Sequence, residues 1–249
     1  MVNYPYDLHT HTRLSDGWDT VRGNVRAAEA CGMKAVAITD HLFFLSDSEL
    51  VEKVLDQVHA ARQESPIRVL AGVEGVVLDP MGHTSVTPDV ADRLDLVLVD
   101  FGARTEGIGS DAPLDKGQAL ANLVSAVAGL SMLPYVDILA HPLNLGRLDC
   151  TLVLDDLSPK ALREMAQAMA EGQVAFEIMN QFHYWWPGVA VAELTARYAE
   201  IVALFAEEGV RFSMGSDAHR TGGVGNLAWS LRLAAAAGLT DSQMFVPVL

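Results

Sequence analysis

The chain has 249 residues, half of them hydrophobic, and its 32 acidic and 17 basic side chains give a net charge of −15. A chain this apolar can bury a large core, and one this acidic should repel nucleic acid polymers and anionic membranes at long range. Two distant cysteines, Cys31 and Cys150, predict reduced and mostly buried thiols and exclude a disulfide framework. Without a signal-peptide pattern at the N-terminus or a long apolar run, we expect a cytoplasmic protein.

Short apolar runs alternate with helical patterns along the chain. Strands are predicted at residues 4–8, 35–39, 68–73, 94–99, 136–140, 174–178 and 211–214. Helices are predicted at about 19–31, 47–64, 114–130, 159–171, 189–208 and 224–237. Asp19 is placed to cap the first helix, and Ser158 before Pro159 a later one. The alternation indicates a parallel sheet, and periodicity alone leaves a closed barrel and a doubly wound open sheet both open.

Every predicted strand ends in, or leads into, a residue that can bind a cation. In chain order these residues are His9, His11, His41, Glu74, Asp100, His141, Glu177, Asp217 and His219. In a parallel barrel all C-terminal strand ends meet at one face, which holds the active site. Imidazoles and carboxylates gathered there form a ligand set for Zn, Mn or Fe.

The spacing of these residues along the strands predicts which of them can bind the same ion. Residues two apart in a strand point the same way, so His9 and His11 can hold one ion together, as can Asp217 and His219. Glu74 can bridge two ions, as two-metal hydrolytic sites require. A single strand-end His is usually structural and a single Asp is usually a helix cap, but their recurrence at successive strand ends predicts a metal centre.

Four further residues lie in loops on the same predicted face. His83 and His183 each either join the site or are ordinary loop residues. Trp185 and Trp186 follow His183, and either wall a substrate pocket or anchor the loop on the core.

The motifs DLHTHTRLSDG, AITDH, GVEG, LAHP and SDAH, in this order between Asp7 and His219, resemble those of the PHP family, the polymerase and histidinol phosphatase superfamily. The resemblance covers nearly the whole chain. It implies an α/β fold, a distorted (β/α)7 TIM-like barrel forming a single domain over residues 1–249. It also implies two or three divalent metal ions (Zn, Mn or Fe) and hydrolysis of phosphate esters by a metal-activated water.

Carried over position by position, the resemblance implies a set of eight metal ligands. They are His9, His11, Asp16, His41, Glu74, His141, Asp217 and His219. One departure stands out, because the family usually has a His just after the fourth strand and this chain has no His between residues 84 and 140. Either Asp100 substitutes for it, or His83 does, or one metal site is weakened.

The expected substrate is a small phosphomonoester, because no inserted domain interrupts the barrel pattern. Asp217 or His183 is expected to help move the proton during hydrolysis. Arg147 and Arg220 are each either a ligand for a phosphate oxygen or a solvated surface residue. Two alternatives stay open: a metal hydrolase of a C–N or carboxylic ester bond, and a catalytically silent metal-binding module.

Overall fold

The computed structural model describes residues 2–45, 48–148 and 150–247. The strands are β1 (Tyr6–Asp7), β2 (Ala35–Ile38), β3 (His41–Leu42), β4 (Arg68–Val76), β5 (Leu96–Asp100), β6 (Ile138–Leu139), β7 (Ala175–Met179) and β8 (Phe212–Gly215). The helices are α1 (Val21–Ala30), α2 (Ser48–Arg62), α3 (Pro88–Ala91), α4 (Lys116–Ser131), α5 (Pro159–Gly172), α6 (Val191–Glu207) and α7 (Ala228–Ala236). Short 3-10 turns lie at Leu145–Arg147, Leu154–Asp156, Phe182–Trp185, Thr221–Gly223 and Asp241–Gln243.

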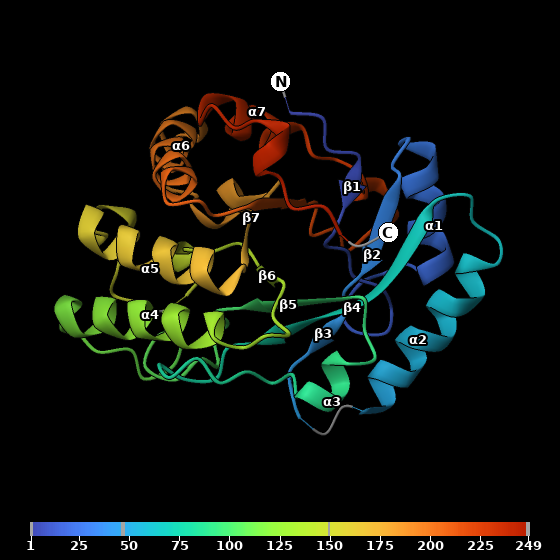
Figure 1. Ribbon diagram of the computed structural model, residues 1–249, viewed down its shortest axis with the longest axis horizontal. Coiled ribbons are helices and arrows are strands. Elements are labelled where there is room, and N and C mark those ends of the chain that lie inside the picture. The colour runs from blue at the N-terminus through green and yellow to red at the C-terminus, as the bar shows by residue number, and fades with distance from the viewer. Residues whose placement is uncertain (1, 46–47, 149, 248–249) are drawn as a thin grey trace.

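The strands form one parallel sheet in the order β1-β2-β4-β5-β6-β7-β8, and β3 continues the line of β2 to pair with β4. Backbone bonds from Leu8 N to Met214 O (3.3 Å) and from Asp217 N to His9 O (2.9 Å) connect the first and last strands. The helices lie around the outside of the strands (Figure 1). The fold is therefore a nearly closed α/β barrel in a single domain, which confirms the predicted seven-stranded architecture.

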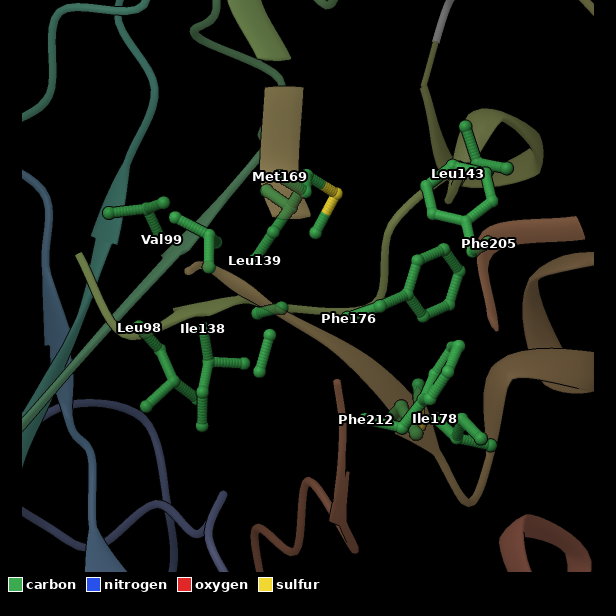
Figure 2. Close-up of a cluster of buried hydrophobic side chains, with 14 of the residues drawn as sticks. Leu98, Val99, Ile138, Leu139, Leu143, Met169, Phe176, Ile178, Phe205 and Phe212 are labelled. Carbon is green, nitrogen blue, oxygen red and sulfur yellow. The ribbon is translucent and has the colours of Figure 1, made fainter. Parts of the chain in front are cut away.

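Apolar side chains of the strands and helices fill the space between them (Figure 2). The ring of Phe176 in β7 lies 5.0 Å from that of Phe205 in α6 and 5.8 Å from that of Phe212 in β8. Ile138 and Leu139 in β6 are fully buried beside them. Each such side chain contributes about 1.5–3 kcal/mol by leaving water. The packed strands thus give their polar C-terminal residues a rigid support.

The predicted caps are partly right. Ser158 accepts a hydrogen bond from the backbone N–H of Ala161, as expected. At α1, however, Thr20 is the cap and accepts from Gly23 N. Asp19 instead accepts from Thr221 N at 2.9 Å, because the loop after β8 lies against this segment.

Several predicted boundaries shift. β4 continues to Val76, beyond the predicted end at 73, because its last residues pair with β5. α7 begins at Ala228, after the predicted start at 224, and residue 47 lies outside the described residues. Both thiols are free, but the expectation of burial is wrong: Cys31 is exposed and Cys150 is half-buried. None of the described helices is long and apolar enough to cross a membrane.

Candidate metal centre

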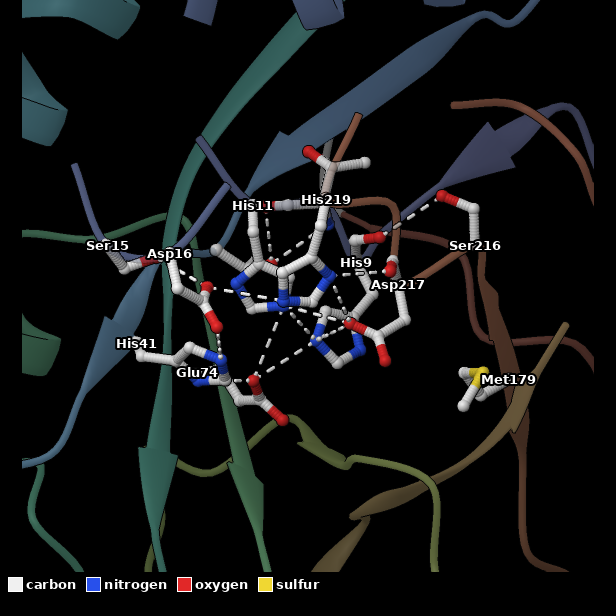
Figure 3. A network of polar contacts seen from close by, with 12 residues as sticks. His9, His11, Ser15, Asp16, His41, Glu74, Met179, Ser216, Asp217 and His219 are labelled. Carbon is white, nitrogen blue, oxygen red and sulfur yellow. Dashed lines mark hydrogen bonds and ion pairs between the residues drawn. The ribbon is translucent and has the colours of Figure 1, made fainter. Parts of the chain in front are cut away.

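The polar side chains at the C-terminal strand ends point toward one another at the centre of the barrel face (Figure 3). His9 and His11, which follow β1, hold their Nε2 atoms 3.0 Å apart. Asp217 Oδ1, after β8, lies 3.0 Å from His11 Nε2, and Glu74 Oε2, in β4, lies 3.3 Å from His9 Nε2. Carboxylates from two other strand regions therefore both approach this pair of imidazole nitrogens.

The chemistry of these donors fits a divalent cation. Glu74 is 1% exposed, and among the described residues neither of its oxygens accepts a hydrogen bond of good geometry. A buried carboxylate without such partners is costly unless a cation offsets its charge. Two imidazole nitrogens facing each other at 3.0 Å are separated much as two ligands of one ion are. We therefore find that the residues present fit a metal ion.

Two neighbouring groups share these ligands. Asp16 Oδ1 lies 3.2 Å from His219 Nε2, its Oδ2 lies 3.6 Å from His41 Nε2, and His11 completes the group. On the other side, His141 Nε2 lies 3.0 Å from Glu74 Oε1. All eight predicted ligands thus come together, with Glu74 between the groups as a bridging residue would be.

The carboxylates of the centre stay deprotonated. Burial opposes ionisation of Asp217, but the charge of His9 and the hydrogen bond with His11 lower its pKa below the usual range. Burial also opposes ionisation of Glu74, and here the charges of His9 and His41 lower the pKa well below normal. Burial lowers the pKa of His41, yet Glu74 and Asp16 raise it to about 10. The anionic carboxylates are in the state that cation binding requires, while His41 must release a proton to bind.

Asp40, between β2 and β3, positions the segment that carries Asp16. Its buried carboxylate accepts backbone N–H bonds from Thr12 at 2.8 Å and Ser15 at 3.1 Å. It also accepts bonds from both hydroxyls, at 2.8 Å and 2.6 Å. This network holds a ligand-bearing turn that has no regular secondary structure.

Asp7, in β1, does the same for the segment after β8. Its carboxylate accepts from Ser216 N at 2.9 Å, Ser216 Oγ at 2.7 Å and Gly225 N at 2.7 Å. Asp217 follows with φ +52°, and His141 has φ +31° at its own strand end. Such backbone conformations are uncommon in non-glycine residues and cluster at functional sites.

Glu177, in β7, contacts two of the predicted ligands, whereas the sequence placed it only among the strand-end residues that can bind a cation. Its Oε1 lies 2.9 Å from His9 Nδ1, and its Oε2 accepts from the backbone N–H of His141 at 2.7 Å. With Nδ1 occupied by the carboxylate, the Nε2 of His9 faces the centre. Carboxylates that hold metal-binding histidines in this way tune the metal. Its strand-end position was the available signal, but only the fold supplies its partners.

A cavity of about 280 Å³ opens beside the cluster. Apart from the cluster it is lined by Arg147, Met179, Gln181, Tyr184 and Trp185. Arg147 places Nη1 3.2 Å from Asp100 Oδ2, and its guanidinium lies 5.1 Å from the Trp185 ring centroid. The Trp185 ring meets His141 edge-on at 4.8 Å. The cavity thus joins an arginine and an aromatic wall to the cluster.

Of the two tryptophans, one lines the cavity and the other anchors the loop on the core. Trp185 walls the cavity, whereas Trp186 is buried and packs against Phe182 with ring centroids 6.5 Å apart. His183 lies 5.9 Å from the Trp229 ring and is not among the described residues that line the cavity. The expectation that His183 joins the site therefore receives no support, because its loop turns the ring toward α7.

The two residues considered as substitutes for the missing histidine, His83 and Asp100, lie in different places. His83 is 69% exposed and pairs with Asp79 at 2.8 Å, away from the cluster. Asp100 is instead buried with Glu74 and His141, their ligand atoms all within 4.8 Å of one another. Arg220 stacks on Trp18, 3.9 Å from its ring centroid, and lines a second cavity that shares Gln181, Asp217 and His219 with the first.

Comparison with known proteins agrees with this arrangement. A sequence profile of the PHP domain matches residues 7–212. A probable phosphatase of Proteus mirabilis (strain HI4320) is 28% identical over 233 residues, covering 93% of this chain and 85% of that protein. A probable phosphatase of Thermoanaerobacter sp. (strain X514) is 24% identical over 247 residues, covering 94% and 87%.

Among solved structures, the chain is similar to the histidinol phosphate phosphatase of Lactococcus lactis, complexed with Zn, L-histidinol and phosphate. The TM-score is 0.65 at 16% identity, covering 94% of each chain. This likeness confirms the barrel fold. Together with the profile match over most of the sequence, it establishes that the chain belongs to the PHP domain family.

Proposed function

We propose that the protein is a metal-dependent phosphoesterase that hydrolyses a small phosphomonoester. The observation that carries the proposal is the convergence of His9, His11, Glu74 and Asp217 on one buried point beside an open cavity. The phosphatase names of the curated relatives support the reaction, and the complex of the Lactococcus lactis enzyme supports a small substrate.

The eight ligands would hold two or three divalent ions of Zn, Mn or Fe. They are His9, His11, Asp16, His41, Glu74, His141, Asp217 and His219. When bound, such ions supply hydroxide near neutral pH and neutralise the charge that develops on the phosphoryl oxygens.

The chain's own residues bind and orient the substrate. Arg147 lines the cavity and presents a guanidinium that can take two phosphate oxygens at once. Trp185 limits the cavity on the same side, next to His141. Arg220 lines the neighbouring cavity, beside Asp217 and His219, and is the second candidate for a phosphate oxygen. These residues would hold a phosphate group between the cluster and the aromatic wall.

Of the two residues expected to help move the proton, Asp217 is better placed than His183. Asp217 touches the cluster, and its low pKa keeps it in the acceptor form. His183 faces Trp229, so we assign it no contact with the reacting atoms. Because a carboxylate with a low pKa is a weak base, its main contribution is to orient the attacking water.

Phosphate release from a panel of small phosphomonoesters tests the proposal. The enzyme is assayed with Mn²⁺ or Zn²⁺, with and without a chelator, beside the His141→Ala and Asp217→Ala variants. We expect release by the wild type that the chelator stops, and none by either variant, with far-UV circular dichroism showing the same fold. Full activity in either variant would contradict the site.

The alternatives are separate outcomes of this test. Metal-dependent cleavage of amides or carboxylic esters without phosphate release would identify the other hydrolase class. Metal binding with no hydrolysis of any substrate would identify a silent module.

The wider setting is part of the proposal as well. We assign the protein a cytoplasmic location. Because its net charge is −15, we assign it no nucleic acid polymer or anionic membrane as partner. We assign residues 1–249 to one PHP-type domain. Size-exclusion chromatography with light scattering measures the oligomeric state.

A further inference from the structure

Asp100 occupies the place where the resemblance led us to expect a histidine. It is the last residue of β5, between the strands that carry Glu74 and His141, and it is 2% exposed. One ligand atom from each of Asp100, Glu74 and His141 lies within 4.8 Å of the others. The other candidate, His83, is 69% exposed and paired with Asp79, so it does not fill this position.

Two buried carboxylates, those of Asp100 and Glu74, lie close together at this position. Glu74 aims a 1%-exposed carboxylate into it, and neither oxygen accepts a hydrogen bond of good geometry among the described residues. Two buried carboxylates this close repel each other strongly in a medium of low dielectric constant. Of these two carboxylates, Arg147 pairs with Asp100, at 3.2 Å. The guanidinium lies on the Asp100 side of the pair, and on this side Glu74 faces the His141 ring, with Oε1 3.0 Å from Nε2.

We infer that Asp100 is a ligand of a second divalent cation, which it binds together with Glu74 and His141. This inference rests on the proposed metal centre but not on the identity of the substrate. Two carboxylates and one imidazole make this site richer in oxygen than the neighbouring group of His9, His11 and Glu74. Carboxylates suit Mn²⁺ and imidazoles suit Zn²⁺. The substitution of Asp for His therefore shifts the preference of this one site toward Mn²⁺.

Arg147 competes with the cation for Asp100. Its Nη1 lies 3.2 Å from Asp100 Oδ2, and its guanidinium stacks on Trp185 at the cavity wall. A cation that binds Asp100 weakens this ion pair and repels the guanidinium. Arg147 is then free to turn toward a phosphate in the cavity while it keeps its contact with Trp185. Loading of the second site and binding of the phosphate are thus coupled through one side chain.

The test measures bound metal directly. Wild type, Asp100→Asn and Asp100→His are stripped with chelator, dialysed against Mn²⁺ or Zn²⁺, and analysed for metal content and for spin coupling between Mn²⁺ ions by electron paramagnetic resonance. In Asp100→Asn we expect the weakest Mn²⁺ site to lose at least about tenfold in affinity, as ligand-shell changes do, together with the coupled signal. In Asp100→His we expect the ratio of Zn²⁺ to Mn²⁺ affinity to rise about tenfold at that site.

Two variants separate ligation from a structural ion pair. His83→Ala is the matched control and should leave metal content unchanged. Arg147→Met removes the ion pair but keeps Asp100, so the second Mn²⁺ should bind severalfold more tightly. If Asp100 served only to hold Arg147, then Asp100→Asn would keep all its metal and Arg147→Met would bind Mn²⁺ no more tightly, and the inference would be overturned.

Failure of the proposed function would look different. Wild-type protein that binds coupled Mn²⁺ in an Asp100-dependent way but releases no phosphate would sustain the inference and refute the phosphoesterase. Protein that releases phosphate with unchanged metal content in Asp100→Asn would do the reverse. If Asp100→Asn does not fold, the Zn²⁺/Mn²⁺ ratio of Asp100→His and the affinity of Arg147→Met still decide.

Discussion

Replacing Glu177 by Gln perturbs the metal centre without touching a proposed ligand. The carboxylate now satisfies two donors, His9 Nδ1 at 2.9 Å and the backbone N–H of His141 at 2.7 Å. Glutamine has nearly the same shape but only one acceptor oxygen, so one of the two donors must face an NH2 group. The substitution therefore removes one charge-assisted hydrogen bond and creates a donor–donor contact in a buried place.

The magnitude follows from that single lost bond. A hydrogen bond to a charged group contributes about 1.5–3 kcal/mol. Because every 1.4 kcal/mol is a factor of about ten, metal affinity should fall about 10- to 100-fold, which matches the usual effect of residues that support metal ligands. The loss is expected at the site that contains His9, since the ring is then free to turn away.

Isothermal titration calorimetry of the chelator-stripped protein with Mn²⁺ measures this loss of metal affinity. Glu171→Gln, an exposed change at the end of α5, is the matched control and should behave as wild type. Phosphate release at limiting metal should fall in Glu177→Gln and recover in part at saturating metal. Wild-type affinity in Glu177→Gln would refute the view that this carboxylate orients His9.

Three more predictions concern the supports of the ligands and their protons. In Gly215→Ala the added Cβ would collide with Glu177 Oε1 and push this carboxylate away from His9. Metal affinity should therefore fall at least as far as in Glu177→Gln, and a thermal melting curve shows whether the variant is still folded. Asp40→Asn should loosen the turn that carries Asp16 and remove one equivalent of bound metal while the tightest site is kept, which metal analysis by mass spectrometry detects. Because the pKa of His41 is raised from 6.5 to about 10, the ring is protonated below about pH 10 and must lose its proton to bind an ion. Apparent Mn²⁺ affinity should therefore rise as the pH rises from 6.5 toward about 10. Calorimetry in two buffers of different ionisation enthalpy should show that binding releases a proton, and an affinity that falls as the pH rises would contradict this assignment.

Part of the site was predictable because its information is local. His9 and His11 lie two residues apart at a strand end, and the alternation of strand and helix says which ends share a face. The strand-end side chains of such a set meet wherever a parallel barrel forms, whereas Asp16, in a turn, was expected only from the family resemblance. The barrel itself followed from the motifs, since periodicity left an open sheet equally possible.

The residues around the ligands were not predictable in this way. Glu177 and His9 are 168 positions apart, and no local pattern states that their side chains touch. Arg147 and Arg220 looked equivalent in sequence, yet the first lines the cavity and the second stacks on Trp18 beside it. Trp185 and Trp186 are adjacent, but the turn at Phe182–Trp185 sends one to the cavity and the other into the core.

The sequence by itself therefore determined the barrel class through its motifs. It also determined the face that carries the chemistry and the residues that can bind ions, because strand-end position expresses both. Only the tertiary structure decided that Asp100, and not His83, joins Glu74 and His141, and that His183 faces Trp229. Those outcomes depend on how loops pack against distant strands, which is set by burial and hydrogen bonding across the whole barrel and not by spacing along the chain.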